Sequence, residues 1–263
     1  HGEFPRIVLS SGDVEECIYD AMKALNYAQR YQLPVLHLID KNLANMTDLV
    51  PDIDVHKVKV EQVTPAEHTP EYKRYSLDTT TGVSKIGFLG KNIFWMTGDE
   101  HDELGHVTED PEIRDKMMQK RFKKLETAAA EIPMNDKAVL YGEDDADVTF
   151  VTWGSQKGVV LDVIEDLKEE GITANLLYLK MFEPFPSEFV AKVLRKAKLV
   201  IDVESNMLAQ AAKVIRINTG IEIEKCILKY NGRHMTEDEL LRATKNILEE
   251  KEENLVEVLE DGA

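Results

Sequence analysis

The stretch VTFVTWGSQKGVVLDVIEDLKEEGITANLLYL, residues 148–179, decides the fold class of this chain. An apolar run at 148–153 leads into the turn Gly154-Ser155, and apolar residues then recur at helical spacing as far as Gly171. Glycine is the usual residue after a helix C-terminus, and a second apolar run follows at 174–179. A strand, a helix and a strand in this order predict a parallel sheet.

The residues after this unit repeat the alternation. We predict strands at 199–203 and 221–230, and helices that open at Pro186-Ser187, contain Ala209 to Ile215, and start at a capping box from Thr236 to Glu239. The acidic end from Glu249 to Asp261 predicts a fraying helix and a solvated tail. Residues 147–263 are therefore expected to form one α/β domain.

The first 50 residues predict another strand–helix–strand unit. A run at 6–9 precedes Asp13 and Glu16, which resemble a capping box. The following helix carries small and apolar residues at helical spacing: Cys17, Ala21, Ala24, Leu25 and Ala28. Pro34 ends it, and 35–39 predicts a buried strand in which His37 is a hydrogen-bonded core histidine rather than a ligand or base.

Residues 51–146 predict a connecting segment. The proline-rich part 51–98 shows no sustained period, so we expect an irregular connection with at most a short hairpin. Thr108-Glu109-Asp110-Pro111 predicts a helix start with Thr108 as the cap, and the helix runs to Leu125. Its basic stretch is interpreted as a solvated face, with an anionic partner as the alternative. A domain boundary is expected between Pro133 and Asp147.

Composition narrows the function classes. The net charge of −17 would repel the phosphates of a nucleic acid, so a nucleic-acid partner is not expected. Cys17 and Cys226 are expected to be buried thiols in a reducing cytoplasm, and two thiols cannot supply the four ligands of an iron–sulfur cluster. No apolar run reaches the roughly 18 residues of a membrane span, and no signal peptide opens the chain. Because it begins at His1 without Met, a processed or truncated piece is expected.

The densest polar cluster lies between Gly98 and His106. It contains Glu100, His101, Asp102, Glu103 and His106. A metal site would use both histidines and a carboxylate, but their spacing differs from HExxH, and the flanking glycines indicate a loop. We expect no metal here; a loop ordered at an interface or near an active site is favoured over a solvated turn.

The segment Gly154 to Gly158 follows a strand and opens a helix, a position that can bind phosphate. It lacks both GxGxxG and GxxxxGK[ST], and a tight strand-to-helix turn explains it equally well. Ser155 is not expected to be a nucleophile because GxSxG is absent.

Several blocks resemble, in order, the α-subunit of 2-oxoacid:ferredoxin oxidoreductases of the 2-oxoglutarate or broad 2-oxoacid type. They are His1–Leu9, Gly12–Glu16, Tyr31–Val35, Tyr72–Tyr75, Thr97–Glu103, Gly105-His106, Thr108–Glu112, Lys120-Arg121 and Lys124-Leu125. Four further blocks are similar to the carboxy-terminal domain of transketolase-type enzymes: Asp147–Thr149, Trp153–Ser155, Glu169–Ile172 and Val203–Asn206.

This resemblance implies an α/β chain with the end of a thiamine-diphosphate pyrimidine-binding-type domain at 1–50, a connecting segment at 51–146, and a transketolase-like parallel-sheet domain at 147–263. It implies oxidative decarboxylation of a 2-oxoacid to acyl-CoA with reduction of ferredoxin, in the cytoplasm and in complex with a β-subunit. Thiamine diphosphate, Mg²⁺ and the iron–sulfur cluster would be held mostly by that partner, and none by this chain alone, which is expected to be inactive by itself.

Two departures from the family pattern stand beside this expectation. The Tyr-Pro-Ile-Thr-Pro-Ser-type block and the Arg-bearing block, which carry substrate and pyrimidine contacts in the family, are absent. The family's usual Gly-Gln is replaced by Ala209-Gln210. Two alternatives stay open: a thiamine-enzyme subunit of the 2-oxoacid dehydrogenase type, and a non-catalytic assembly module.

Overall fold

The structure is a computed structural model and describes residues 2–249 and 255–260. The chain divides into two compact units, which are described separately. The first comprises His1–Ile7, Ala21–Leu36 and Val55–Ile132, and the second Val8–Asp20, His37–Asp54 and Pro133–Ala263. Among the described helices, none is long and apolar enough to cross a membrane.

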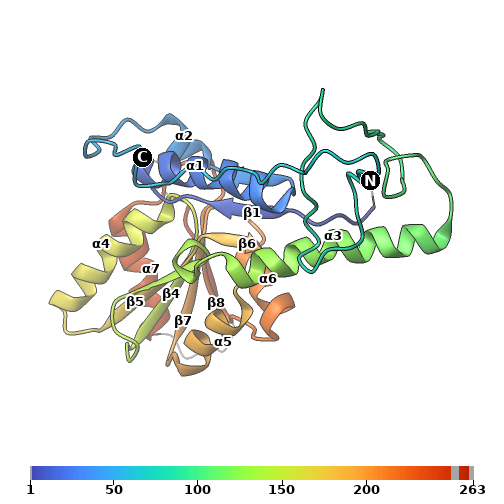
Figure 1. Ribbon diagram of the computed structural model, residues 1–263. Coiled ribbons are helices and arrows are strands. Elements are labelled where there is room, and N and C mark those ends of the chain that lie inside the picture. The colour runs from blue at the N-terminus through green and yellow to red at the C-terminus, as the bar shows by residue number, and fades with distance from the viewer. Residues whose placement is uncertain (1, 250–254, 261–263) are drawn as a thin grey trace. The chain divides into compact units, whose positions relative to one another are not determined.

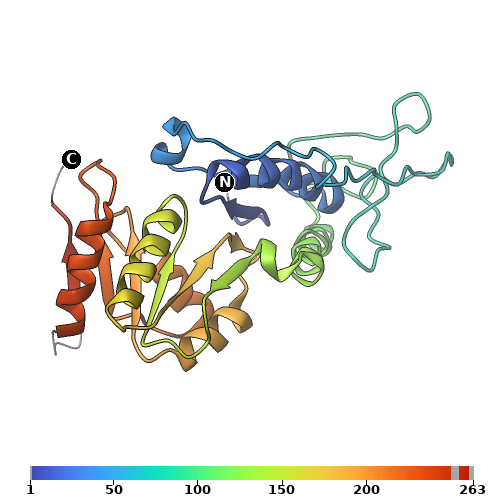
Figure 2. The ribbon, with the colours of Figure 1, turned by 90° about the vertical axis from the view of Figure 1, so that its left-hand side faces the viewer.

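The second unit is built on a six-stranded sheet in the order β3-β5-β4-β7-β8-β9 (Figures 1 and 2). Five strands are parallel, and β3 alone in this sheet pairs antiparallel, with β5. The strands are β3 Ala138–Tyr141, β4 Val148–Thr152, β5 Ala174–Leu179, β7 Val200–Glu204, β8 Lys225–Leu228 and β9 Leu255–Val258. The predicted parallel α/β architecture is confirmed.

Helices cover both faces of this sheet, as parallel strands require. The side chains of α4 (Gln156–Glu169) and α7 (Glu237–Glu249) share one apolar core with the sheet, and those of α5 (Ser187–Lys196) and α6 (Gln210–Thr219) share another. Phe150, Leu176 and Ile201 point into the first core, whereas Val151 and Leu177 point into the second. This alternation places consecutive strand residues in different cores and explains the continuous apolar runs of the sequence.

The helix boundaries of this unit follow the expected signals. Thr236 and Glu239 form the predicted capping box: the Thr236 N–H donates to Glu239 Oε2 over 2.9 Å, and the Glu239 N–H donates to Thr236 Oγ1 over 3.4 Å. Gly171 follows α4 with a positive φ of 81°, which glycine adopts without a steric penalty.

A three-stranded sheet in the order β2-β1-β6 joins the start of the chain to a distant segment. It consists of β1 (Ile7–Ser10), β2 (Val35–Leu38) and β6 (Met181–Glu183), and β1 pairs antiparallel with β6. The predicted buried strand at 35–39 is wrong in its burial, because β2 lies at the sheet edge and its residues are half-buried or exposed.

The helix α1 (Val14–Tyr31) forms where the sequence predicts it, but its buried side chains are different. Tyr19, Tyr27 and Tyr31 are buried, whereas Leu25 of the expected apolar stripe is 74% exposed. Tyrosine rings bury much more apolar area than the alanines of that stripe, and their hydroxyl groups keep a polar partner.

In the first unit, α3 (Pro111–Glu131) is the long helix drawn in green in Figure 1. Residues 51–110 are irregular, with isolated bridges from Pro65 to Ile86 and from His101 to Val107 among the described residues. The cap of α3 is Asp110 rather than Thr108: its Oδ1 accepts from the N–H groups of Glu112 and Ile113.

The division between the two units falls at Pro133, the start of the segment Pro133–Asp147, and this segment also contains the unpredicted strand β3. One further expectation is wrong. The segment 249–261, predicted to be a frayed helix and tail, contains β9, which pairs parallel with β8; residues 250–254 and 261 lie outside the described residues. Both strands are only four residues long and are fixed by backbone pairing that the local pattern does not reveal.

Candidate functional site

The loop between Gly98 and His106 is held to α3 by Glu100. Its carboxylate forms ion pairs with Arg114 and with Arg121, the latter over 2.6 Å. The Arg121 hydrogen bond, which outweighs the cost of burial, lowers the pKa of Glu100 to about 2. Glu100 is therefore ionised and anchors the loop.

The other candidate residues of this loop are bonded within the first unit. Asp102 Oδ1 accepts from the N–H groups of Leu104 and His106 over 2.9 and 3.0 Å. Glu103 pairs with Lys73 over 2.8 Å and also accepts from the Leu77 N–H. His101 packs its ring 4.0 Å from that of Tyr75, and the rings of His106 and Trp95 meet edge to face. These contacts build an ordered loop.

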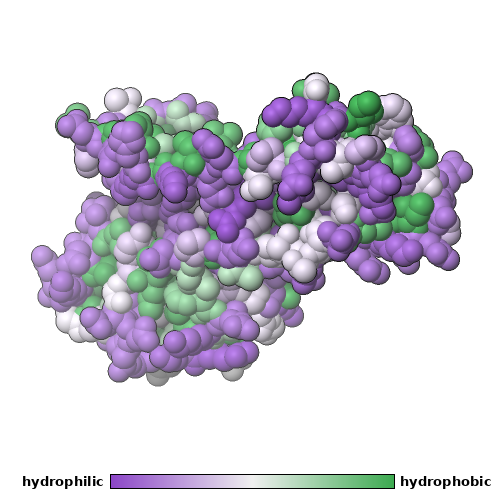
Figure 3. All heavy atoms as spheres, viewed as in Figure 1, coloured by the Kyte–Doolittle hydropathy of each residue, from purple (hydrophilic) through white to green (hydrophobic). Residues whose placement is uncertain are grey.

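In the part of the chain that the structure describes, no three His, Cys, Asp or Glu side chains come together as metal ligands. Exposed apolar side chains precede this loop in the sequence. Five of them follow Gly87 in the sequence: Phe88, Leu89, Ile93, Trp95 and Met96. On the face drawn in Figure 3, hydrophilic residues predominate and hydrophobic ones form patches between them. Exposed apolar residues that lie together on a surface mark interfaces between proteins.

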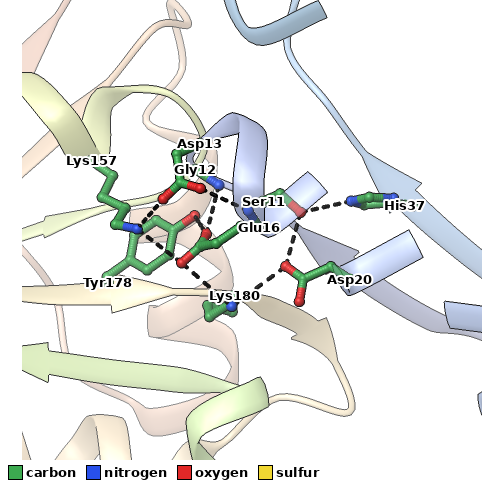
Figure 4. Close-up of polar contacts among 9 residues, drawn as sticks. All are labelled: Ser11, Gly12, Asp13, Glu16, Asp20, His37, Lys157, Tyr178 and Lys180. Carbon is green, nitrogen blue, oxygen red and sulfur yellow. Dashed lines mark hydrogen bonds and ion pairs between the residues drawn. The ribbon is translucent and has the colours of Figure 1, made fainter. Parts of the chain in front are cut away.

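The second unit contains a charge network between the start of α1 and the large sheet (Figure 4). Lys157, on α4, lies at its centre and donates to Asp13 Oδ2 over 2.6 Å and to Glu16 Oε1 over 2.9 Å. The Lys157 side chain is 12% exposed, and although burial opposes its charge, the two carboxylates raise its pKa. Burial likewise opposes the charge of Asp13, but the Glu16 N–H and Lys157 outweigh it and lower the pKa of Asp13.

The network continues through Lys180 to the histidine of β2. Lys180 Nζ lies 3.5 Å from Glu16 and 3.4 Å from Asp20. Ser11 Oγ donates to Asp20 over 2.9 Å and lies 2.8 Å from His37 Nε2. His37 is thus hydrogen-bonded, as predicted, and its desolvation lowers its pKa so that it is neutral at pH 7. Three carboxylates and two lysines satisfy one another here, and no spacing in the sequence indicates that they lie together.

The start of α4, considered above as a weak phosphate site, is already occupied by a carboxylate of the chain itself. Asp40 Oδ2 accepts from the Ser155 N–H over 2.8 Å, and Asn42 donates to Ser155 Oγ. A phosphate would have to displace Asp40. The segment 154–158 is a strand-to-helix turn tied to the residues that follow β2.

A second pair of buried acids lies on β7. Glu204 is fully buried and accepts from Trp153 Nε1, Asn206 Nδ2 and the Ala211 N–H at the start of α6. Burial and the neighbouring Glu204 raise the pKa of Asp202 well above its ordinary value. The block Val203–Asn206 therefore fixes the start of α6, which is a structural role. Cys226 on β8 is buried as predicted, while Cys17 is half-buried, and both are free thiols.

The chemistry of these groups is structural. Each charged group of the network has a partner of opposite sign, and the start of α4 carries Asp40. The start of α4 therefore does not fit the diphosphate of thiamine diphosphate, because the Asp40 carboxylate already accepts from the Ser155 N–H there.

Two family models match the chain in sequence order. Residues 2–120 match the thiamine-diphosphate-binding domain of pyruvate flavodoxin/ferredoxin oxidoreductases, and residues 146–240 match core domain II of pyruvate:ferredoxin oxidoreductase. These matches define the class of the chain: a subunit built from the domains of thiamine-dependent, ferredoxin-linked oxidoreductases.

Curated relatives define the subunit. The chain is 44% identical over 97% of its length to a 2-oxoacid:ferredoxin oxidoreductase subunit alpha from Saccharolobus solfataricus, and 42% identical over 97% to one from Aeropyrum pernix, covering 41% and 40% of those proteins. A solved 2-oxoglutarate:ferredoxin oxidoreductase from Magnetococcus marinus, with 2-oxoglutarate, coenzyme A and succinyl-CoA bound, superposes on 94% of the chain and 43% of its own chain, with a TM-score of 0.86 and 31% identity.

The chain belongs to the family of 2-oxoacid:ferredoxin oxidoreductase α-subunits, as the resemblance of its sequence blocks indicated. It spans about two fifths of the length of the relatives from Saccharolobus solfataricus and Aeropyrum pernix.

Proposed function

We propose that this chain forms part of the α-subunit of a thiamine-diphosphate-dependent 2-oxoacid:ferredoxin oxidoreductase, which converts a 2-oxoacid and coenzyme A to acyl-CoA and CO₂ and reduces ferredoxin. The observation that carries the proposal is the continuity of the match: 44% identity over 97% of the chain includes the irregular segment 51–110 as well as both sheets. Irregular segments do not converge on one sequence for packing reasons alone.

The thiamine cofactor would supply the carbanion chemistry, and the protein would orient it and exclude water. This chain would contribute the rigid part. The charge network around Lys157 holds β1 and the start of α1 against the large sheet, and β6 extends the small sheet. Mg²⁺, the diphosphate and the iron–sulfur cluster would lie mostly in a β-subunit, and ferredoxin would bind the assembled complex in the cytoplasm.

We also propose that the loop containing Glu100, His101, Asp102, Glu103 and His106 lies at the β-subunit interface or beside the active site. The ordered geometry of the loop and the exposed Phe88, Leu89 and Trp95 beside it in sequence support this role. The division into a domain end at 1–50, a connecting segment at 51–146 and a domain at 147–263 stays a prediction.

The proposal is tested by tagging the chain in its source organism and purifying the complex that it forms. We expect a partner subunit to co-purify, and viologen reduction to require a 2-oxoacid and coenzyme A. The rates with 2-oxoglutarate and with pyruvate give the preferred substrate. A stable complex that reduces no acceptor with any 2-oxoacid would support the assembly-module alternative instead.

The same preparation tests the alternative that the chain belongs to an enzyme of the 2-oxoacid dehydrogenase type. A 2-oxoacid dehydrogenase component passes its acyl group to lipoyl, so it would reduce lipoyl-linked acceptors and be indifferent to ferredoxin. A lipoyl-dependent activity without ferredoxin reduction would contradict the proposal.

A further inference from the structure

Helix α3 presents basic side chains whose setting differs from that of a solvated helix face. Lys120 is only 9% exposed, and its ammonium donates to the Gly82 carbonyl over 2.6 Å. Lys124 donates to the Gln32 carbonyl over 3.2 Å. Within the described ranges neither lysine has a carboxylate partner, so the interpretation of the basic stretch as a solvated face is wrong for these two residues.

Positive charge accumulates around Lys120. Burial, followed by the repulsion of Lys124, Arg74 and Arg121, lowers the pKa of Lys120 to about 7. Glu103 has the opposite influence, but its oxygens are already bonded to Lys73 and to the Leu77 N–H. Arg74 donates to the side chain of Gln32, a neutral partner. An anion that approached Lys120 would relieve this repulsion.

A hollow of about 380 Å³ lies over this part of α3, within the range of about 300–1,000 Å³ typical of small-molecule sites. Its lining comes from α3 and from the turn at 77–82: Leu77, Thr79, Thr80, Gly82, Lys116, Gln119, Lys120 and Lys123. Six of these eight residues are lysine, threonine or glutamine, and no carboxylate lines the hollow among the described residues.

The turn is held firmly on the helix. Gly82 has a φ of 77°, and a β-carbon there would lie 2.5 Å from the Lys120 carbonyl oxygen. Thr127 Oγ1 also donates to the Thr81 carbonyl over 2.9 Å. The hollow is thus preformed by the fold.

Several donors in the lining have no partner in the described part of the chain. Lys116, Gln119 and the Thr80 side chain make no hydrogen bond or ion pair with a described residue, and the same holds for the N–H groups of Thr80 and Gly82. Lys123 pairs with Glu126, an exposed contact of little strength.

We propose that this hollow binds the phosphate groups of a small phosphorylated molecule, with Lys116, Lys120 and Lys123 neutralising them. Lysine ammonium groups bind phosphate as point charges, and backbone N–H groups in a turn add donors. The volume exceeds that of a lone phosphate, which favours a diphosphate or a nucleotide. The inference stands on the geometry of α3 and does not rest on the proposed function.

The test is calorimetric titration of the whole chain with inorganic pyrophosphate, in a phosphate-free buffer at pH 7 and low salt. The informative variant is Lys116→Gln with Lys123→Gln, because both side chains are exposed and their loss leaves the packing intact. Losing two charge-assisted contacts weakens binding by about tenfold or more. The matched control is Lys168→Gln with Lys213→Gln, which removes the same charge from exposed positions of α4 and α6.

The expected result is binding that the first pair of substitutions weakens at least tenfold and the control pair by less than twofold. An equal loss in both variants would reduce the effect to net charge and overturn the site, as would no binding of pyrophosphate at millimolar concentration. Chemical acetylation of the lysines locates the site independently. Pyrophosphate should protect Lys116 and Lys123 from acetylation but not Lys168, and equal labelling of all three would contradict the proposal.

Two further ligands distinguish the sources of the phosphate. ADP or coenzyme A binding at least tenfold tighter than pyrophosphate identifies a nucleotide as the ligand. Equal affinities identify the phosphate groups alone as what the hollow recognises. Both outcomes retain the site, and both must disappear in the variant of Lys116 and Lys123.

Discussion

Two groups of buried or half-buried lysines in this chain have opposite surroundings. In the second unit, Lys157 and Lys180 meet the carboxylates of Asp13, Glu16 and Asp20. In the first unit, Lys120 and Lys124 meet only carbonyl oxygens among the described residues, and other cations surround them. The pKa of Lys157 is raised, whereas the pKa values of Lys120 and Lys124 are lowered to about 7 and about 8.

This difference indicates that the lysines of the second unit stabilise the fold, whereas those of the first unit can bind an anion. A lysine matched by carboxylates stabilises the arrangement that matches it, and breaking the match is costly. A lysine buried beside other cations costs free energy in the absence of a ligand, and it favours binding of an anion. We therefore expect the unmatched lysines of the first unit to take part in binding and the matched lysines of the second unit to stabilise the fold.

The largest expected effect comes from breaking the matched group. Lys157→Met leaves Asp13 and Glu16 without their closest cation and should lower the free energy of unfolding by about 3 kcal/mol. Urea unfolding followed by circular dichroism measures it. Lys168→Met, which removes an exposed lysine paired with Glu165, should change stability by less than about 0.5 kcal/mol. An equal loss of stability in Lys157→Met and Lys168→Met would contradict a stabilising role of the matched lysine.

The close contact of the turn with α3 gives the next effect. Gly82→Ala should destabilise by at least about 2 kcal/mol, because the left-handed backbone and the contact with the Lys120 carbonyl both oppose a β-carbon. Gly220→Ala is the matched control: its φ is 72°, but nothing lies within 4 Å, so about 1 kcal/mol is expected. Equal losses of stability in Gly82→Ala and Gly220→Ala would show that the turn at 77–82 moves away from α3 at little cost in free energy.

The smallest effect is a difference in how the free energy of unfolding depends on pH. Lys120 titrates at about 7 in the folded chain and near its ordinary value when unfolded, so between these values the unfolded chain binds more protons and stability rises with pH. Relative to Lys120→Met, the wild type should gain on the order of 1 kcal/mol per pH unit between pH 7 and 9. Parallel stability curves of the two proteins in phosphate-free buffer would contradict an unmatched Lys120.

Much of the large sheet could be predicted from local pattern. Residues 174–179 were placed correctly because a glycine, an apolar run and the end of a helix coincide there. The strands β3 and β9 were not, because four-residue strands are defined by their partners β5 and β8 rather than by their own composition. The cap of α3 moved to Asp110 because its carboxylate reaches two N–H groups.

The site features were harder to predict. Lys157 and Asp13 are 144 positions apart, and sequence spacing carries no signal for such a contact. The burial of Lys120 depends on where the turn at 77–82 folds back, which the irregular segment does not encode in a recognisable period. The family resemblance, in contrast, depended on short blocks that are read directly, and it was confirmed.

A titration of activity against subunit ratio tests most directly whether this chain is part of a catalytic complex. Viologen reduction with 2-oxoglutarate or pyruvate and coenzyme A is measured for the chain alone and with increasing amounts of the co-purified partner. We predict no reduction by the chain alone and a rate that rises and saturates at a fixed molar ratio. A 2-oxoacid-dependent rate from the chain alone would overturn its proposed role as part of a catalytic subunit, as would a rate that the partner produces unchanged without the chain.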